Sequence, residues 1–254
     1  DLLGARLPGA SLPGKTLPGA SLPGASLAGA GAGELLLSVG STAPRKRIDI
    51  LLRVFAGVLN EFPEARLIRA GGPLTGPQLQ LARQLGVDRS IVELPFVERA
   101  VLAAVYQRAT LLLHPSDAEG FGLPVVEAMD YGCRVAATDL PVLREIGGHA
   151  AVYCPAGDVS EWIRCVTHLL HQRRSAPAFW SSFRSRSIEN AKRFTWRENA
   201  DRAASVYQCM CPEMKEEMAA SSSLSLLSRT RVTPTERISC ELKDARSIAF
   251  GPGK

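Results

Sequence analysis

Residues 110–138 have the sequence TLLLHPSDAEGFGLPVVEAMDYGCRVAAT, and this stretch decides the fold. The apolar runs Thr110–His114 and Arg134–Thr138 are typical of buried parallel strands. Between them, a Gly-rich loop leads into a helix that we predict from about Pro124 to Tyr131. A strand, a helix and a strand in this order predict a βαβ unit with two parallel strands.

The same alternation extends outward over residues 34–208. Further short apolar runs predict strands, and apolar residues at helical spacing predict helices. Strict alternation predicts an α/β fold, a doubly wound Rossmann-like parallel sheet that binds ligands in the loops beyond its strands, here after Val39, Leu94 and Leu113. The additional strands are Leu35–Val39, Arg66–Ala70, Ile91–Leu94 and Val152–Tyr153, and the additional helices are Ile48–Leu59, Gln78–Leu85, Val101–Arg108, Leu143–Ile146, Asp158–Leu170 with Asp158 as N-cap, Ala178–Arg193 and Arg197–Tyr207.

The two ends of the 254-residue chain differ from this pattern. Residues 1–33 hold eight of the 22 glycines and four of the 17 prolines, in a five-residue repeat of the type Leu-Pro-Gly-Ala-Ser. We predict a low-complexity, flexible segment there rather than a pentapeptide-repeat β-helix, because proline removes donors from a β ladder. Residues 209–254 are rich in serine and lack periodicity, which predicts a disordered tail.

One motif in the repeat is misleading. Gly9–Thr16 satisfies the phosphate-binding pattern GxxxxGK[ST]. That loop requires a buried strand before it and a helix after it. No apolar strand precedes Gly9, and Pro18 breaks the helix that should follow. The match is therefore a coincidence of low complexity.

Composition excludes several classes of protein. A net charge of +5 is too small to indicate nucleic acid binding, and no apolar run is long enough for a membrane helix. No signal-peptide pattern opens the sequence. The six cysteines and four histidines lack metal-site spacing, which favours reduced thiols in a cytoplasmic protein. Residues 172–202 carry the excess positive charge; a solvated face is favoured over a peripheral contact with the inner membrane.

The loop and helix after His114 combine groups that suit a nucleotide. Glu119 and Glu127 stand eight residues apart, and Gly120 to Pro124 lie between them. We expect Pro124 at the first helical position, and the amides of Phe121, Gly122 and Leu123 to face an anion such as a diphosphate. Glu119 is placed to accept hydrogen bonds from sugar hydroxyls and Glu127 to hold a ribose diol. The alternative is two carboxylates that merely favour the helix dipole.

Glu119 and Glu127 match the E-x7-E motif of retaining GT-B glycosyltransferases, and EGFGLPVVEAM closely resembles members of family four. The similarity continues through residues 132–139 and 143–151. Upstream, residues 38–52 resemble the first strand, loop and helix of the same domain, and Leu94–Val97 resembles the segment whose backbone meets the base. The resemblance covers about residues 34–208, the length of a C-terminal donor-binding domain.

The resemblance implies transfer of a hexose from a nucleotide-diphosphate sugar to an acceptor hydroxyl with retained configuration. Glu119 and Lys46 are then the catalytic residues, with Lys46 stabilising charge on the leaving diphosphate. It implies no metal and no cofactor besides a donor of the GDP-mannose or UDP-glucose type, and a glycan or lipid-linked acceptor. The donor-binding residues would be Arg45, Lys46, Phe96, Val97, Glu119, Gly120, Phe121, Gly122, Leu123 and Glu127.

Three departures from the family accompany this expectation. Ser41 follows Gly40 where the family has arginine, so a phosphate cation is missing or is supplied by Arg45. Arg134 replaces a proline. The acceptor-binding N-terminal domain has no counterpart in these residues, so activity is expected only with a partner or missing domain. The alternatives are a nucleotide-sugar binding module without turnover and an interaction protein. A dehydrogenase is disfavoured because Gly29–Gly33 precedes a strand instead of following one.

Overall fold

The computed structural model describes residues 33–94 and 96–210. The predictions for the N-terminal repeat and the C-terminal tail fall outside these residues, apart from Gly33 and the two residues that end the last helix. The chain forms two compact units, one up to Arg197 and one from Glu198 onward. The last helix, which begins at Trp196, therefore falls almost entirely in the second unit and is described by itself. The predicted domain end at residue 208 stays a prediction.

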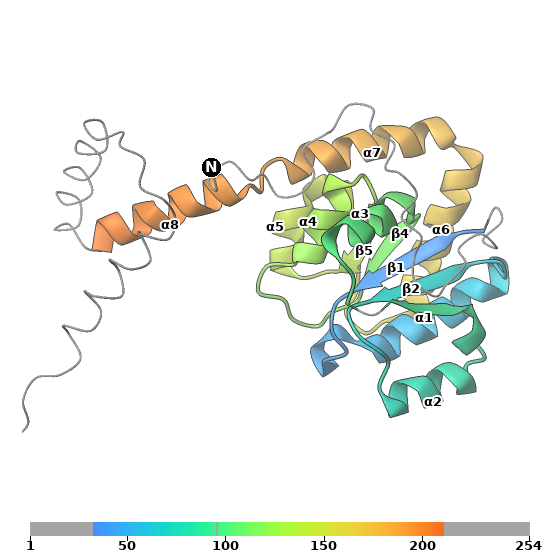
Figure 1. The fold of residues 1–254 in the computed structure, drawn as a ribbon. Helices are drawn as coiled ribbons and strands as arrows, with labels where there is room; N and C mark the ends of the chain where they lie inside the picture. Colours follow the sequence, from blue (N-terminus) through green and yellow to red (C-terminus); the bar gives the residue numbers. More distant parts are fainter. Residues whose placement is uncertain (1–32, 95, 211–254) are drawn as a thin grey trace, which may run out of the picture. The chain divides into compact units, whose positions relative to one another are not determined.

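Six parallel strands form one sheet at the centre of the domain (Figure 1). Their order across the sheet is β3-β2-β1-β4-β5-β6, that of a doubly wound fold, which confirms the predicted fold class. Neighbouring strands are parallel: Leu37 of β1 pairs with Ile68 of β2, and Leu112 of β4 pairs with Val135 of β5. The strands are β1 Leu35–Val39, β2 Arg66–Ala70, β3 Ile91–Leu94, β4 Leu111–His114, β5 Arg134–Thr138 and β6 Ala151–Cys154.

Every predicted helix is present, and the differences lie at the ends. The largest is α6, which continues five residues past the predicted Leu170 to Ser175, and α8 also runs past its predicted end, to Met210. The helices are α1 Ile48–Glu61, α2 Gly76–Gln84, α3 Arg99–Arg108, α4 Leu123–Asp130, α5 Pro141–Gly147, α6 Val159–Ser175, α7 Pro177–Ala191 and α8 Trp196–Met210, with short 3-10 turns at Pro44–Lys46, Asp88–Ser90 and Gly148–Ala150.

Two apolar layers cover the two faces of the sheet. Successive side chains of a strand point to opposite faces, so Leu36 packs under α1 and α6, whereas Leu37 packs under α3, α4 and α5. Helices α1, α2 and α6 accordingly lie on one side of the strands in Figure 1, and α3, α4 and α5 on the other. Burial on both faces explains why the central strands β1 and β4 are nearly continuous apolar runs in the sequence.

The direction of winding reverses between β1 and β4, which are neighbours at the middle of the sheet. The loops that leave their carboxyl ends therefore diverge toward opposite faces, and a crevice between such loops is where doubly wound sheets bind ligands. This places the loop after Val39 beside the loop after His114. Among the described residues, no helix combines the length and apolar character needed to cross a membrane.

Asp158 caps α6 as predicted, its carboxylate accepting a hydrogen bond from the Glu161 amide at 3.0 Å. We expect Asp158→Ala to lower the free energy of unfolding by about 1 kcal/mol, because that amide loses its partner. Urea denaturation measures the change. Asp158→Asn keeps a capping oxygen and should retain most of the stability; equal losses in both variants would contradict the capping role.

Candidate functional site

Two loops meet beyond the carboxyl ends of β1 and β4. The first carries the 3-10 turn Pro44–Lys46 into α1, and the second runs from His114 to the start of α4. Their backbones are joined directly, since the Asp117 amide donates to the Arg45 carbonyl at 2.8 Å. Arg47, in the left-handed conformation at φ 47°, adds a hydrogen bond to Asp117 at 2.9 Å. Backbone and side-chain hydrogen bonds therefore join the two loops into one unit although some 70 residues separate them in the chain.

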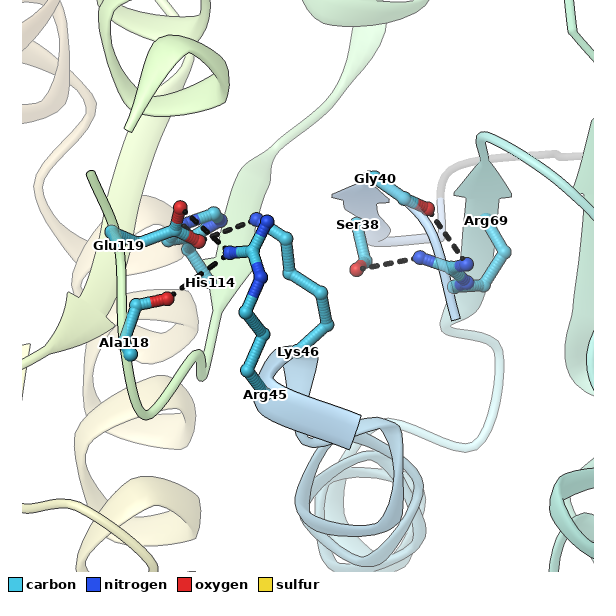
Figure 2. A network of polar contacts seen from close by, with 8 residues as sticks. All are labelled: Ser38, Gly40, Arg45, Lys46, Arg69, His114, Ala118 and Glu119. Atoms are coloured by element: carbon cyan, nitrogen blue, oxygen red, sulfur yellow. Dashed lines mark hydrogen bonds and ion pairs between the residues drawn. The ribbon is translucent and has the colours of Figure 1, made fainter. Parts of the chain in front are cut away.

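Glu119 lies at the centre of this unit (Figure 2). Lys46 forms an ion pair with its Oε1, and Arg45 Nη1 lies 3.2 Å from its Oε2 and 3.1 Å from the Ala118 carbonyl. His114 Nε2 lies 2.9 Å from Oε1 but out of line for a well-directed hydrogen bond. The Glu119 side chain is 6% exposed and that of Lys46 is 11%, against 51% for Arg45. The structure thus brings together the two residues predicted to be catalytic.

Burial alone would raise the pKa of Glu119. Its contacts with His114, Lys46 and Ser116 outweigh that effect and hold its pKa well below the ordinary value. The carboxylate is therefore ionised at neutral pH. It serves as the counter-ion for the cations of the first loop.

Helix α4 begins one residue earlier than predicted. Leu123 is the first helical residue and Pro124 the second, with Gly122 as N-cap at φ 96°, so the expected first position of Pro124 is wrong. A positive φ and an added Cβ only 2.8 Å from Leu143 both require glycine at position 122. Gly120 faces open space. Within the described residues, the amides of Phe121, Gly122 and Leu123 donate no hydrogen bond to the protein, which fits the predicted anion site.

Glu127 is in the second turn of α4 and accepts a hydrogen bond from the Tyr106 hydroxyl at 2.8 Å. Burial raises the pKa of Glu127, and the Tyr106 hydrogen bond and the charge of Arg99 lower it in part. Sequence reasoning missed Tyr106. The sequence feature that could have indicated it is a tyrosine in the apolar stripe of a predicted helix, because a buried hydroxyl needs a hydrogen-bond partner.

Phe96 and Val97, predicted to meet the base, follow β3 at the edge of the sheet. Phe96 is 88% exposed, whereas Val97 packs against the apolar layer that contains Val105 and Tyr106 of α3. No described contact joins either residue to the Glu119 cluster, so the structure does not bring them into it.

Arg69 is a buried cation that sequence reasoning also missed. It is the fourth of the five residues of β2, is 1% exposed, and donates to the Ser38 hydroxyl at 3.3 Å and to the Gly40 carbonyl at 3.0 Å (Figure 2). Gly40 in turn faces the Lys46 side chain, which lies 3.6 Å from where a Cβ would be. Arg69 therefore fixes the end of β1 against which Lys46 packs. An arginine inside an apolar strand was the available signal.

The described residues contain no group of three histidine, cysteine or acidic side chains arranged to hold a metal ion. The positive groups at the site are instead Lys46, Arg45 and the amides at the start of α4. The fold and the site together define a doubly wound α/β domain whose predicted anion site lies at the switch point of the sheet.

The model of the family described as glycosyl transferases group 1 matches residues 27–194, and the chain belongs to this family. It is 34% identical over 180 residues to a D-inositol 3-phosphate glycosyltransferase of Mycobacterium ulcerans, covering 67% of this chain and 37% of that relative. A Mycobacterium leprae protein of the same name is 32% identical over 69% of this chain and 42% of its own length. The chain thus spans about two-fifths of the length of these curated relatives.

Solved structures agree on the fold. Sucrose-phosphate synthase of Thermosynechococcus elongatus superposes with a TM-score of 0.61 at 22% identity, over 72% of this chain and 46% of that chain. The pneumococcal O-GlcNAc transferase GtfA, in complex with UDP and GlcNAc, gives 0.57 at 19% identity, over 68% and 36%.

Glu119→Gln tests the charge balance of the cluster. Because the folded-state pKa is lowered, the ionised carboxylate stabilises the fold above about pH 4, and this stabilisation is lost as the pH falls toward the folded-state value. We expect the wild type to exceed Glu119→Gln in unfolding free energy at pH 7, with a difference that shrinks below about pH 4. Urea denaturation of both proteins at a series of pH values from about 7 down to below about 4 measures this difference in unfolding free energy.

Glu64→Gln is the matched control, since Glu64 is exposed just before β2. Its difference from the wild type should stay near zero throughout. A Glu119→Gln difference that is constant across the pH range would contradict the ion-pair assignment.

Proposed function

We propose that this domain binds the donor of a retaining, family-four type glycosyltransferase of the GT-B fold, which transfers a hexose from a nucleotide-diphosphate sugar to an acceptor hydroxyl. One observation carries the proposal: Lys46, Arg45 and Glu119 converge at the switch point beside the free amides of α4. Membership of the glycosyl transferases group 1 family supports it. The retained configuration is proposed from the resemblance of Glu119 and Glu127 to the E-x7-E motif.

The diphosphate of the donor would lie between the first loop and the start of α4. Lys46 and Arg45 carry positive charge there, and the amides of Phe121, Gly122 and Leu123 lie at the positive end of the helix dipole. Negative charge accumulates on the diphosphate as the glycosidic bond to the sugar breaks. Fixed positive groups therefore stabilise the transition state more than the ground state.

Glu119 then changes partners when the donor binds. In the free domain its carboxylate neutralises Lys46 and Arg45. A diphosphate carries more negative charge than one carboxylate, so it competes for the same cations. Once released, the Glu119 oxygens are free to accept hydrogen bonds from hydroxyls of the donor sugar. Binding of the diphosphate thus prepares the group that holds the sugar.

The remaining roles concern the ribose and the base of the donor nucleotide. Glu127 would hold the ribose diol through a carboxylate oxygen, as acidic residues do in dinucleotide folds. Phe96 and Val97, at the end of β3, would meet the base. We propose a donor of the GDP-mannose or UDP-glucose type, bound without a cofactor.

The acceptor site belongs to a partner or a further domain, because these residues form the donor half of the GT-B fold. A glycan or a lipid-linked acceptor suits the family, and the names of the curated relatives add an inositol phosphate. We propose a cytoplasmic location, in which the basic residues 172–202 are solvated.

Two substitutions separate the roles of the paired charges. Lys46→Gln should weaken UDP or GDP binding by about 10- to 100-fold, because a charge-assisted contact with the diphosphate is lost. Glu119→Gln should instead tighten UDP or GDP binding by about 3- to 10-fold, because the competing carboxylate is removed. Glu119→Gln should also abolish any additional affinity that UDP-glucose or GDP-mannose has over the free nucleotide. Isothermal titration calorimetry measures all of these.

Arg53→Gln provides the matched control for charge, since Arg53 is exposed on α1. It should leave nucleotide affinity unchanged. Weaker binding of the nucleotide to Glu119→Gln than to the wild type would contradict the exchange of partners, and an absence of binding to every nucleotide would contradict the donor-domain function.

A further inference from the structure

The hydroxyl of Tyr106 and the carboxylate of Glu127 form a hydrogen bond between two helices. Tyr106 is in the last turns of α3, and Glu127 is in the second turn of α4. The hydroxyl donates to Oε2 of Glu127 at 2.8 Å. Among the described residues, Oε1 of Glu127 accepts no hydrogen bond. One oxygen is thus held by the protein and the other is left for a ligand.

The tyrosine is fixed from all sides. It is 1% exposed within the apolar layer under α3 and α4, and its ring stacks on that of Tyr131 with centroids 5.8 Å apart and planes 11° from parallel. A buried ring in this arrangement has little rotational freedom. Its hydroxyl therefore offers a donor at a constant position, whereas a glutamate side chain alone samples several rotamers.

We propose that Tyr106 is a positioning residue for the nucleotide ribose: it holds the Glu127 carboxylate in the orientation in which its free oxygen accepts hydrogen bonds from the ribose hydroxyls. This inference rests on the ribose role of Glu127 in the proposed function. Helix α3 then contributes to donor recognition, although the E-x7-E motif lies entirely in α4 and the loop before it. Preorganisation of the carboxylate reduces the entropy lost when the nucleotide binds.

The electrostatic surroundings of Glu127 give the hydrogen bond a second consequence. Tyr106 and Arg99, both on α3, act on this carboxylate. Tyr131, which follows α4, is influenced by Glu127 and by its own neighbour Asp130. Burial raises the pKa of Glu127, and the Tyr106 hydrogen bond opposes that rise. Without the hydroxyl, the pKa of Glu127 would rise further, so nucleotide affinity would begin to fall at a higher pH on acidification.

The test compares nucleotides with and without ribose hydroxyls on the full 254-residue chain. The probes are UDP, GDP and their 2′,3′-dideoxy forms, with affinities from isothermal titration calorimetry between pH 5 and 8. We expect Tyr106→Phe to weaken UDP or GDP binding by about fivefold while binding of the dideoxy forms is unchanged, because only the ribose contact depends on the carboxylate orientation. The acid limb of its affinity profile should move to higher pH.

Tyr131→Phe is the matched control: it removes a hydroxyl from the other ring of the stack, which makes no described hydrogen bond to Glu127. It should keep the wild-type preference for ribose and the wild-type pH profile. In a Glu127→Gln background, Tyr106→Phe should have no additional effect, because the two residues act through one contact.

Two results would overturn the proposal. If Tyr106→Phe keeps the ribose preference of the wild type, or if Tyr131→Phe loses it equally, Tyr106 does not position the carboxylate, although Glu127 can still bind ribose. If the wild type shows no preference for ribose and Glu127→Gln changes nothing, the ribose role of Glu127 itself is wrong, and the role of Tyr106 falls with it.

Discussion

The ion pair between Lys46 and Glu119 is the interaction on which the site depends. The two residues come from loops that leave adjacent strands, and their side chains are almost fully covered. A buried carboxylate is costly unless positive groups surround it. Lys46 and Arg45 meet that need. We propose that the same cations bind a diphosphate, and that Glu119 holds them in place as an internal anion until the donor binds.

The sheet supplies the geometry that makes this pair possible. Because β1 and β4 are parallel neighbours, their carboxyl ends present both loops at one edge, and the chain then turns to opposite faces. Arg69 reinforces the arrangement from below by bonding to Ser38 and Gly40 at the end of β1. Burial lowers the pKa of Arg69, but an arginine guanidinium is not deprotonated in proteins. It therefore adds a permanent positive charge beneath the site.

Much of the fold was predictable because most strands are buried on both faces and so appear as apolar runs; the edge strand β3, with its exposed Glu93, is an exception. Helix ends were less accurate: α6 continues past Leu170 through a polar turn whose arginines pair with the buried Glu34, a tertiary contact that local sequence does not contain. The turn at α4 was predicted one residue late, because Leu123 and Pro124 both suit a first helical position and the φ of Gly122 decides between them.

The site was predictable where the chemistry lies in one continuous motif, as in residues 119–127. It was not predictable where partners come from distant segments. The contact between Lys46 and Glu119 spans 73 residues, and Tyr106 and Glu127 lie on different helices. The spacing of a motif predicts which side chains bind a ligand. Only the folded structure shows which other side chains contact those residues when no ligand is bound.

A structure of the domain with bound UDP or GDP tests the central claim most directly. The account predicts that Lys46 and Arg45 contact diphosphate oxygens, that the ion pair with Glu119 is broken, and that the amides of residues 121–123 face the β-phosphate. A nucleotide bound elsewhere, with the pair between Lys46 and Glu119 intact, would contradict it.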